Sequence, residues 1–194
     1  MARIRTEDFE TVEVRSVEQL RAWFAEHGEQ KDAVWLVTWK KGSDGPYVSA
    51  GELLDEALCV GWMDGVRRKV DDDRTMQLFS PKRVSHWAKS YKDRVARLTE
   101  EGRMRSRGLA EVEAAKASGA WTFMDDVDAL IAPPDLLEAL DASPPARENY
   151  EAFPPSTKRN TLRWIKLAKT QPTREKRIAE TARRATLNER VPNA

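Results

Sequence analysis

The segment from Cys59 to Arg83, CVGWMDGVRRKVDDDRTMQLFSPKR, contains the strongest structural signal in the chain. Residues 66–70 and 75–79 have the composition of two short strands, and the polar run DDDR between them is typical of a turn. Pro81 ends the second strand, because proline has no backbone N–H for a ladder hydrogen bond. The segment therefore predicts a β-hairpin.

Elements on both sides of the hairpin complete the predicted first half of the chain. Upstream, capping-box patterns begin at Ser16 and Ser49, and each is followed by an apolar stripe typical of a helix. Between them, residues 33–41 (AVWLVTWKK) are apolar on both faces, which predicts a strand covered on both sides. Downstream, we expect a helix that begins at Ser85 and carries Trp87, Tyr91, Val95 and Leu98 on one face.

Proline changes the character of the chain after Trp121. Three proline pairs, at residues 133–134, 144–145 and 154–155, predict short helices that begin at them, since the first helical turn tolerates proline. The predicted fold class is α+β, with a small antiparallel sheet packed by helices and then a proline-punctuated C-terminal helical region. We expect a core domain at residues 1–120 and a helical region at residues 121–194 docked on it.

Composition narrows the class of protein. Of the 194 residues, 40% are hydrophobic and 34% are charged, and no apolar run approaches the length of a membrane span. The N-terminal residues lack the apolar stretch of a secretory signal. A single cysteine excludes an internal disulfide and fits a reducing compartment, so we expect a cytoplasmic location.

Charge is distributed unevenly along the chain. Residues 110–151 contain ten acids and two bases, a net charge of −8, whereas residues 157–190 contain eleven bases and three acids, a net charge of +8. The two blocks favour mutual neutralisation over nucleic-acid binding through the basic C-terminus, which stays a weaker alternative.

The predicted hairpin gathers groups that are suited to holding an anion. Basic residues after Gly65 and after Pro81 would meet at one end, beside a helix start whose free backbone N–H groups favour negative charge. Two tryptophans would add an apolar or cation–π wall. The expected ligand-binding residues are Trp62, Asp64, Arg67, Lys82, Arg83, Ser85 and Trp87. An ordinary charged hairpin with two core tryptophans explains the same residues equally well.

Candidates for catalysis are few. Two histidines and one cysteine do not make a zinc site, and the sequence lacks the common cofactor-binding motifs, so we expect no metal and no cofactor. Cys59 ends a predicted helix among apolar residues and is expected to be buried and inert. Asp64 lies between two glycines, where it either bonds its own turn or faces a pocket as a general acid or base.

The order of these motifs resembles the YdeI/OmpD-associated family, also called bacteriocin-protection proteins. The resemblance runs from Val34 to Ile178 and rests on the segments VWLVTWKKG, DEALCVGWMDGVRRKVDDDR, FSPKRVSHWAKSYKDRVARLTEEGRM and LRWIKLAKTQPTREKRI. The closing pattern is carried by Trp164, Ala168, Lys169, Thr173, Arg174, Arg177 and Ile178. The family pattern also gives weight to Asp55, Glu56, Cys59, Trp62, Asp64, Gly65, Pro81, Ser85, Trp87 and Arg94.

One departure from the family pattern affects the expected ligand. Relatives read S-x-W-S-x-x-N where this chain reads SHWAKSY, so Ala88 replaces a hydroxyl and Tyr91 an amide. The resemblance implies a role in tolerance of bacteriocins or antimicrobial peptides and no established enzyme activity. Our hypothesis is a non-enzymatic, cytoplasmic binding protein for a small anionic ligand or a protein partner. The alternative is an enzyme that uses Asp64 as general acid or base.

Overall fold

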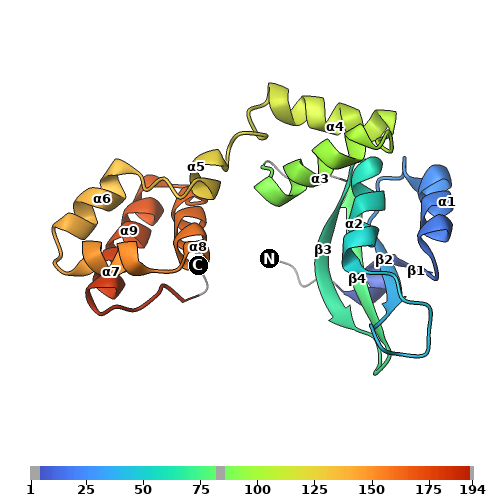
Figure 1. The fold of residues 1–194 in the computed structure, drawn as a ribbon, viewed down its shortest axis with the longest axis horizontal. Helices are drawn as coiled ribbons and strands as arrows, with labels where there is room; N and C mark the ends of the chain where they lie inside the picture. The colour runs from blue at the N-terminus through green and yellow to red at the C-terminus, as the bar shows by residue number, and fades with distance from the viewer. Residues whose placement is uncertain (1–4, 82–85, 193–194) are drawn as a thin grey trace. The chain divides into compact units, whose positions relative to one another are not determined.

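The computed structural model describes residues 5–81 and 86–192, and the chain divides into two compact units, Met1–Trp121 and Thr122–Ala194 (Figure 1). The first unit combines a sheet with helices, and the second unit is built from helices alone in the part that is described. The α+β fold class predicted from the sequence is therefore confirmed.

Four strands of the first unit form one sheet in the order β1-β2-β4-β3. The predicted hairpin is present as β3 (Trp62–Lys69) and β4 (Arg74–Pro81), which pair antiparallel with Lys69 opposite Thr75. β2 (Val34–Trp39) also pairs antiparallel with β4, whereas β1 (Glu10–Glu13) pairs parallel with β2. The sheet is thus mixed instead of antiparallel, because helix α1 carries the chain back between β1 and β2, as a parallel connection requires.

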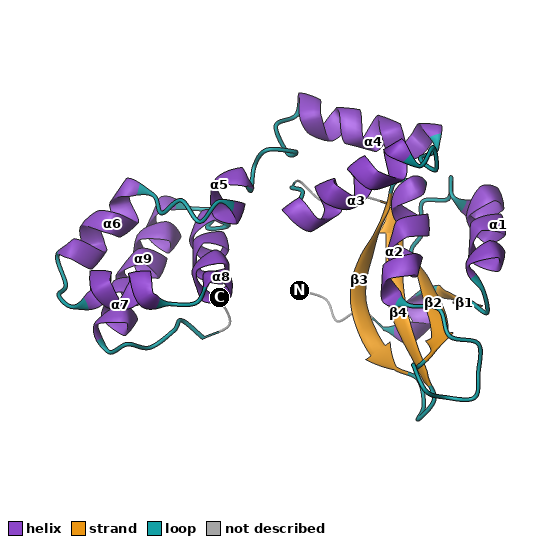
Figure 2. Cartoon of the chain, viewed as in Figure 1, coloured by secondary structure: helices purple, strands orange, loops and turns teal. Residues whose placement is uncertain are grey.

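Helices α1 (Val17–His27) and α2 (Ala50–Cys59) cover one face of the sheet, as Figure 2 shows. Their apolar stripes pack on Val34, Leu36, Trp62 and Phe79 in one core cluster. On the opposite face, Trp35, Val37, Met76 and Leu78 are also buried. β2 is therefore covered on both sides, as its doubly apolar sequence predicts.

The helix boundaries follow local signals in most places. Ser16 accepts a hydrogen bond from the Gln19 backbone N–H at 3.1 Å, and Ser49 forms a complete capping box with Glu52. The predicted start at Ser85 lies outside the described residues, but α3 (Lys89–Glu100) begins four residues later, with Ala88 in the N-cap position. Trp87 precedes this helix and is buried.

The described part of the second unit packs five helices around one apolar core: α5 (Asp125–Asp128), α6 (Pro134–Asp141), α7 (Ala146–Ala152), α8 (Pro155–Lys166) and α9 (Gln171–Thr186). Each proline pair lies directly at the start of α6, α7 or α8, as predicted. Helix α9 carries only a narrow apolar stripe, Ile178, Ala182 and Ala185, and all three residues are buried in this core.

The acidic and basic blocks neutralise each other in part within this unit. Asp126 pairs with Lys166 at 2.5 Å, and Asp135 pairs with Arg174 at 2.8 Å. The Arg174 guanidinium lowers the pKa of Asp135 below its usual value by hydrogen bonding to the charged carboxylate. These pairs hold α8 and α9 against the acidic helices α5 and α6.

None of the helices in the described ranges combines the length and the apolar character needed to cross a bilayer.

A close backbone approach sets α4 (Ser106–Ala117) against the end of α2. The Arg105 N–H donates to the Cys59 carbonyl oxygen at 2.8 Å, and Gly108 lies directly over the same group. A Cβ atom at Gly108 would lie 2.4 Å from the Cys59 carbonyl oxygen, closer than Cβ atoms approach backbone oxygen in proteins. The chain therefore needs glycine here for the first turn of α4 to reach this position.

We expect Gly108→Ala to lower the free energy of unfolding by about 1–3 kcal/mol, because the added methyl group forces two backbone segments apart. Gly51 is the matched control: it also lies in the first turn of a helix, but its added Cβ would meet only Arg94 nitrogens, at 3.6 Å and beyond, and the Ser49 hydroxyl oxygen at 3.8 Å. Urea unfolding of both variants should show Gly51→Ala as stable as the parent or slightly more so. Equal losses in the two variants would contradict the assigned contact.

Candidate functional site

The two tryptophans expected to form a binding wall are core residues in the structure. Trp62 is fully buried, its indole N–H donates to the Gly28 carbonyl oxygen at 2.8 Å, and its ring lies edge-on to Phe24. Trp87 is also buried and packs against Trp121 with ring centroids 5.2 Å apart.

Among the described residues, Asp64 bonds to side chains and not to its own turn. Its carboxylate accepts from the Tyr91 hydroxyl at 2.7 Å and from the Gln77 amide at 2.9 Å. Exposed Arg67 joins the same group, because its guanidinium donates to the Gln77 amide oxygen at 3.0 Å. Tyr91, which departs from the family pattern, is therefore a direct partner of Asp64. The acid–base role of Asp64 stays a prediction.

Lys82, Arg83 and Ser85, the other members of the expected site, lie outside the described residues. The structure brings together Asp64, Arg67, Gln77 and Tyr91, and it places Trp62 and Trp87 in two different core clusters. The predicted ligand site at the hairpin end stays a prediction.

A different polar centre is built around α2. Glu56 is 5% exposed, and its carboxylate lies between Arg21 of α1, at 2.7 Å, and Arg103 of the turn after α3, also at 2.7 Å. Arg21 binds it through two nitrogens, which is the strong geometry for an arginine–carboxylate pair. One carboxylate thus ties two segments on either side to α2.

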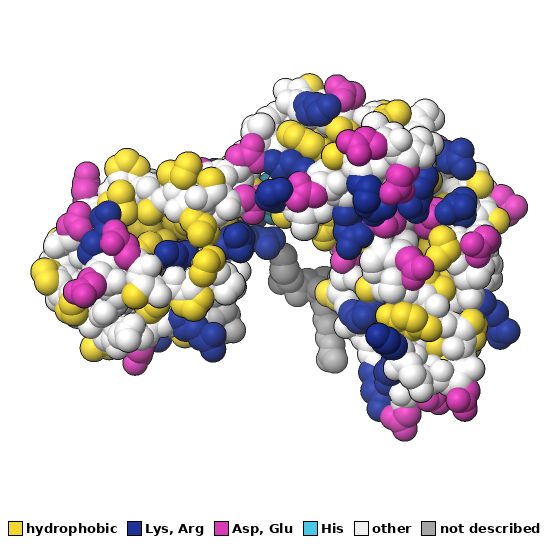
Figure 3. Space-filling view, viewed as in Figure 1, with side chains coloured by type: hydrophobic (Ala, Val, Ile, Leu, Met, Phe, Trp, Pro, Cys, Tyr) yellow, Lys and Arg dark blue, Asp and Glu magenta, His cyan; other side chains and the backbone are white. Residues whose placement is uncertain are grey.

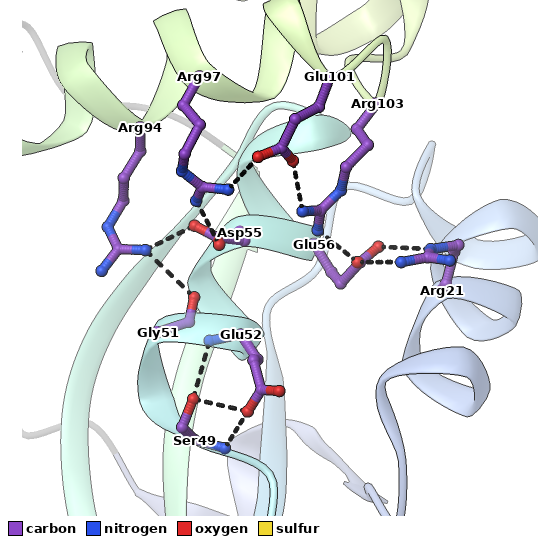
Figure 4. Close-up of polar contacts among 10 residues, drawn as sticks. All are labelled: Arg21, Ser49, Gly51, Glu52, Asp55, Glu56, Arg94, Arg97, Glu101 and Arg103. Carbon is purple, nitrogen blue, oxygen red and sulfur yellow. Dashed lines mark hydrogen bonds and ion pairs between the residues drawn. The ribbon is translucent and has the colours of Figure 1, made fainter.

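The same centre extends along α3, as Figure 4 shows. The neighbouring residue Asp55 accepts from Arg94 and Arg97 at 2.5 Å each, and Arg97 also binds Glu101 at 2.8 Å. Glu101 in turn binds Arg103 at 2.9 Å, which closes the chain of ion pairs back to Glu56. The network therefore positions Arg103 from two sides.

A cavity of about 510 Å³ opens beside this network, between α1, the end of α2 and the first turn of α4. Four arginines line it, Arg21, Arg103, Arg105 and Arg107, against the two acids Glu29 and Glu56. Phe24, Ala25, Cys59 and Val60 give it an apolar wall. In the space-filling view, basic side chains gather among acidic ones over the helices of this unit (Figure 3).

The four arginines that line the cavity differ in the hydrogen bonds and ion pairs that they form with the rest of the protein. Arg21 and Arg103 share the Glu56 carboxylate, but the buried Nε of Arg103 has no acceptor among the described residues. Arg107 donates to the Gly28 carbonyl oxygen and lies 3.7 Å from exposed Glu29. Arg105 is exposed and forms no ion pair within the described part of the chain. The cavity therefore keeps a net positive charge and unused donors.

Sequence reasoning missed this cavity. Its one local signal is the run RMRSR at residues 103–107, which is flanked by Gly102 and Gly108 and places three arginines within one turn. Arg21, Glu29 and Glu56, its other charged members, come from distant parts of the chain, and of these only Glu56 was marked, by the family resemblance. Within the described residues, no group of three histidine, cysteine, aspartate or glutamate side chains is arranged to hold a metal ion.

Cys59 lies at the apolar side of the cavity and is buried, as predicted. Burial raises the pKa of the Cys59 thiol to about 11, and the negative charge of Glu56 adds to this shift. The thiol is thus protonated at neutral pH.

The comparisons with known proteins divide the chain in two. Residues 12–111 match the family model of a domain of unknown function, DUF8412, which spans just over half of the 194 residues. The chain belongs to this family. Residues 129–187 match a second model, described as bacteriocin-protection, YdeI or OmpD-associated, which confirms the resemblance seen in the sequence.

The DUF8412 match contains the whole arginine cavity, and the YdeI/OmpD-associated match covers α6 to α9. The motifs before Ala129 that carried much of the resemblance lie outside the second match. The chain matches no curated protein and no solved structure.

Removing the Glu56 carboxylate should strongly destabilise the first unit. We expect Glu56→Ala to lower the free energy of unfolding by about 3 kcal/mol, near the lower limit for breaking a buried ion pair, because both guanidiniums reach water. Asp72→Ala is the control: Asp72 is 93% exposed and pairs with Lys69, and exposed pairs contribute at most about 1 kcal/mol. Denaturant unfolding measures both variants, and equal effects would contradict a special role for Glu56.

The Cys59 thiol should resist modification in the folded protein. With a pKa of about 11 and little exposure, it should react with a disulfide reagent at pH 7–8 far more slowly than in urea. Absorbance of the released thiolate follows the reaction, and the rate in urea is the internal control. A native rate equal to the unfolded rate would show that the thiol is accessible.

Proposed function

We propose that this protein is a non-enzymatic binding protein for a small anionic ligand, and that the ligand occupies the cavity lined by Arg21, Arg103, Arg105 and Arg107. The observation that carries the proposal is the excess of arginine over acid around a partly apolar cavity. Arginine is the side chain best suited to bind carboxylate or phosphate, because its planar group offers several N–H donors.

The backbone supports the same ligand chemistry. α4 begins at the cavity, and its N-cap residue Arg105 makes no side-chain hydrogen bond to the helix end. Ser106 and Arg107, which also line the cavity, occupy the first turn, where backbone N–H groups lack intrahelical acceptors. These donors and the helix dipole favour negative charge at this position.

The cavity suits binding more than chemistry. Its size lies within the usual range for small-molecule sites, about 300–1,000 Å³. Glu56 is engaged by two arginines, and the Cys59 thiol is held protonated by burial, so neither group is poised to act as a base or nucleophile. The apolar wall of Phe24, Ala25 and Val60 favours a ligand that joins an anionic head to an apolar body.

The setting of this activity is part of the proposal. The description of the family matched by residues 129–187 supports a role in bacteriocin tolerance. A single buried, unpaired cysteine supports a reducing compartment, and we therefore place the protein in the cytoplasm.

Anion binding at this cavity should raise the melting temperature of the protein. A screen of phosphate, citrate, nucleoside phosphates and short fatty acids tests this, because a ligand present at 100 times its Kd stabilises the folded state by about 2.7 kcal/mol. We expect Arg105→Ala to weaken the ligand found by about tenfold or more, since a hydrogen bond to a charged group contributes about 1.5–3 kcal/mol.

The variant Arg67→Ala is the control, because it removes an exposed basic residue of the hairpin that does not line the cavity. It should retain binding. If this variant abolishes binding and Arg105→Ala does not, the ligand lies at the hairpin end. If no anion shifts the melting temperature, the proposed function is wrong.

A further inference from the structure

The second unit has a groove of its own on the α8–α9 helix pair. It has a volume of about 520 Å³ and is lined by Trp164 of α8 and by one face of α9 from Thr173 to Arg183. Ten residue steps along α9 correspond to about 15 Å, which is the length of roughly four residues of extended peptide. On the side of this unit seen in Figure 3, basic side chains lie among hydrophobic ones.

Arg177 and Trp164 form the central wall of the groove. The Arg177 guanidinium lies 5.0 Å from the centroid of the Trp164 ring, in cation–π geometry, and donates to the Trp164 carbonyl oxygen near the end of α8. Both side chains are half-buried, so each retains an accessible surface. Trp164 thus offers apolar area directly beside a fixed positive charge.

Part of the unpaired positive charge of the helix pair lies at this groove. Lys166 and Arg174 are neutralised by Asp126 and Asp135, whereas Lys176 and Arg177 form no ion pair among the described residues. The one acid of the groove, Glu180, is bound by Arg183 at 2.9 Å and by Arg184 at 2.6 Å.

We propose that this groove binds an acidic peptide segment of a protein partner. Carboxylates of the segment would pair with Lys176, Arg177 and Arg183, and an apolar side chain between them would cover the exposed part of Trp164. Charge complementarity of this kind mainly sets specificity and association rate, while burial of the tryptophan supplies an anchor. This site is separate from the arginine cavity of the first unit, and it does not depend on the function proposed for that cavity.

The groove fits a peptide better than a nucleic acid. Single-stranded nucleic acids bind where bases stack on free aromatic faces along a continuous basic groove. Here Arg177 already covers one face of the Trp164 ring, and the Glu180 carboxylate interrupts the row of basic residues. Both features disfavour phosphates and stacked bases, and neither hinders a peptide that alternates acidic and apolar side chains.

Fluorescence anisotropy of the full chain with a labelled peptide of alternating glutamate and leucine, ten residues long, tests the proposal. The same peptide with glutamine in place of glutamate, and a single-stranded DNA of equal charge, are measured beside it at physiological salt. We expect saturable binding of the acidic peptide and no binding of the glutamine peptide or the DNA. Lys176→Glu should weaken this binding at least tenfold, because the new carboxylate repels the acidic peptide. The variant should still fold, since Lys176 is exposed and forms no ion pair among the described residues.

Arg163→Glu is the matched control for charge. Arg163 is an exposed residue of α8 without an ion pair in the described chain, and it does not line the groove. This variant should bind the peptide within twofold of the parent. Equal weakening by both variants, absence of binding, or tighter binding of the DNA than of the peptide would each overturn the proposal.

Discussion

The first unit depends on a single buried carboxylate. Glu56 lies near the end of α2, where it meets Arg21 from the helix before it and Arg103 from the turn after α3. A buried charge is tolerated only when it is paired and hydrogen-bonded, so both arginines have to approach this point for α2 to pack on the sheet. The same requirement draws α1 and the start of α4 to the two sides of α2 and leaves the cavity between them.

The arginine cavity therefore follows from the ion pairs that Glu56 forms with Arg21 and Arg103. Arg21 and Arg103 stabilise the fold because they neutralise Glu56, whereas Arg105 forms no ion pair among the described residues. Gly108 sets the geometry, because only a residue without a side chain lets α4 begin directly over the Cys59 carbonyl. Structural roles and the proposed binding role thus meet in one short turn, residues 102–108, and changes there are expected to affect both.

Local signals in the sequence predict much of the fold. The caps at Ser16 and Ser49, the hairpin and the three proline-started helices are each specified within a few residues, and all are present. The parallel strand β1 was missed, because the segment ETVE is short and polar and gains its place only by pairing with distant β2. The arginine cavity was also missed: three of its arginines lie close together in residues 103–107, but its other walls come from residues far apart in the chain.

The order of the strands also bears on the behaviour of the protein at high concentration. β3 is an outer strand of the sheet, and it presents exposed Val66 together with Arg67 and Lys69. An outer strand with an exposed valine can pair with the same strand of a second copy of the protein. Positive charges on the strand oppose this pairing, because the charges of the two copies repel each other. Arg67 and Lys69 therefore oppose pairing of two copies through β3, and this effect of the hairpin charge requires no ligand.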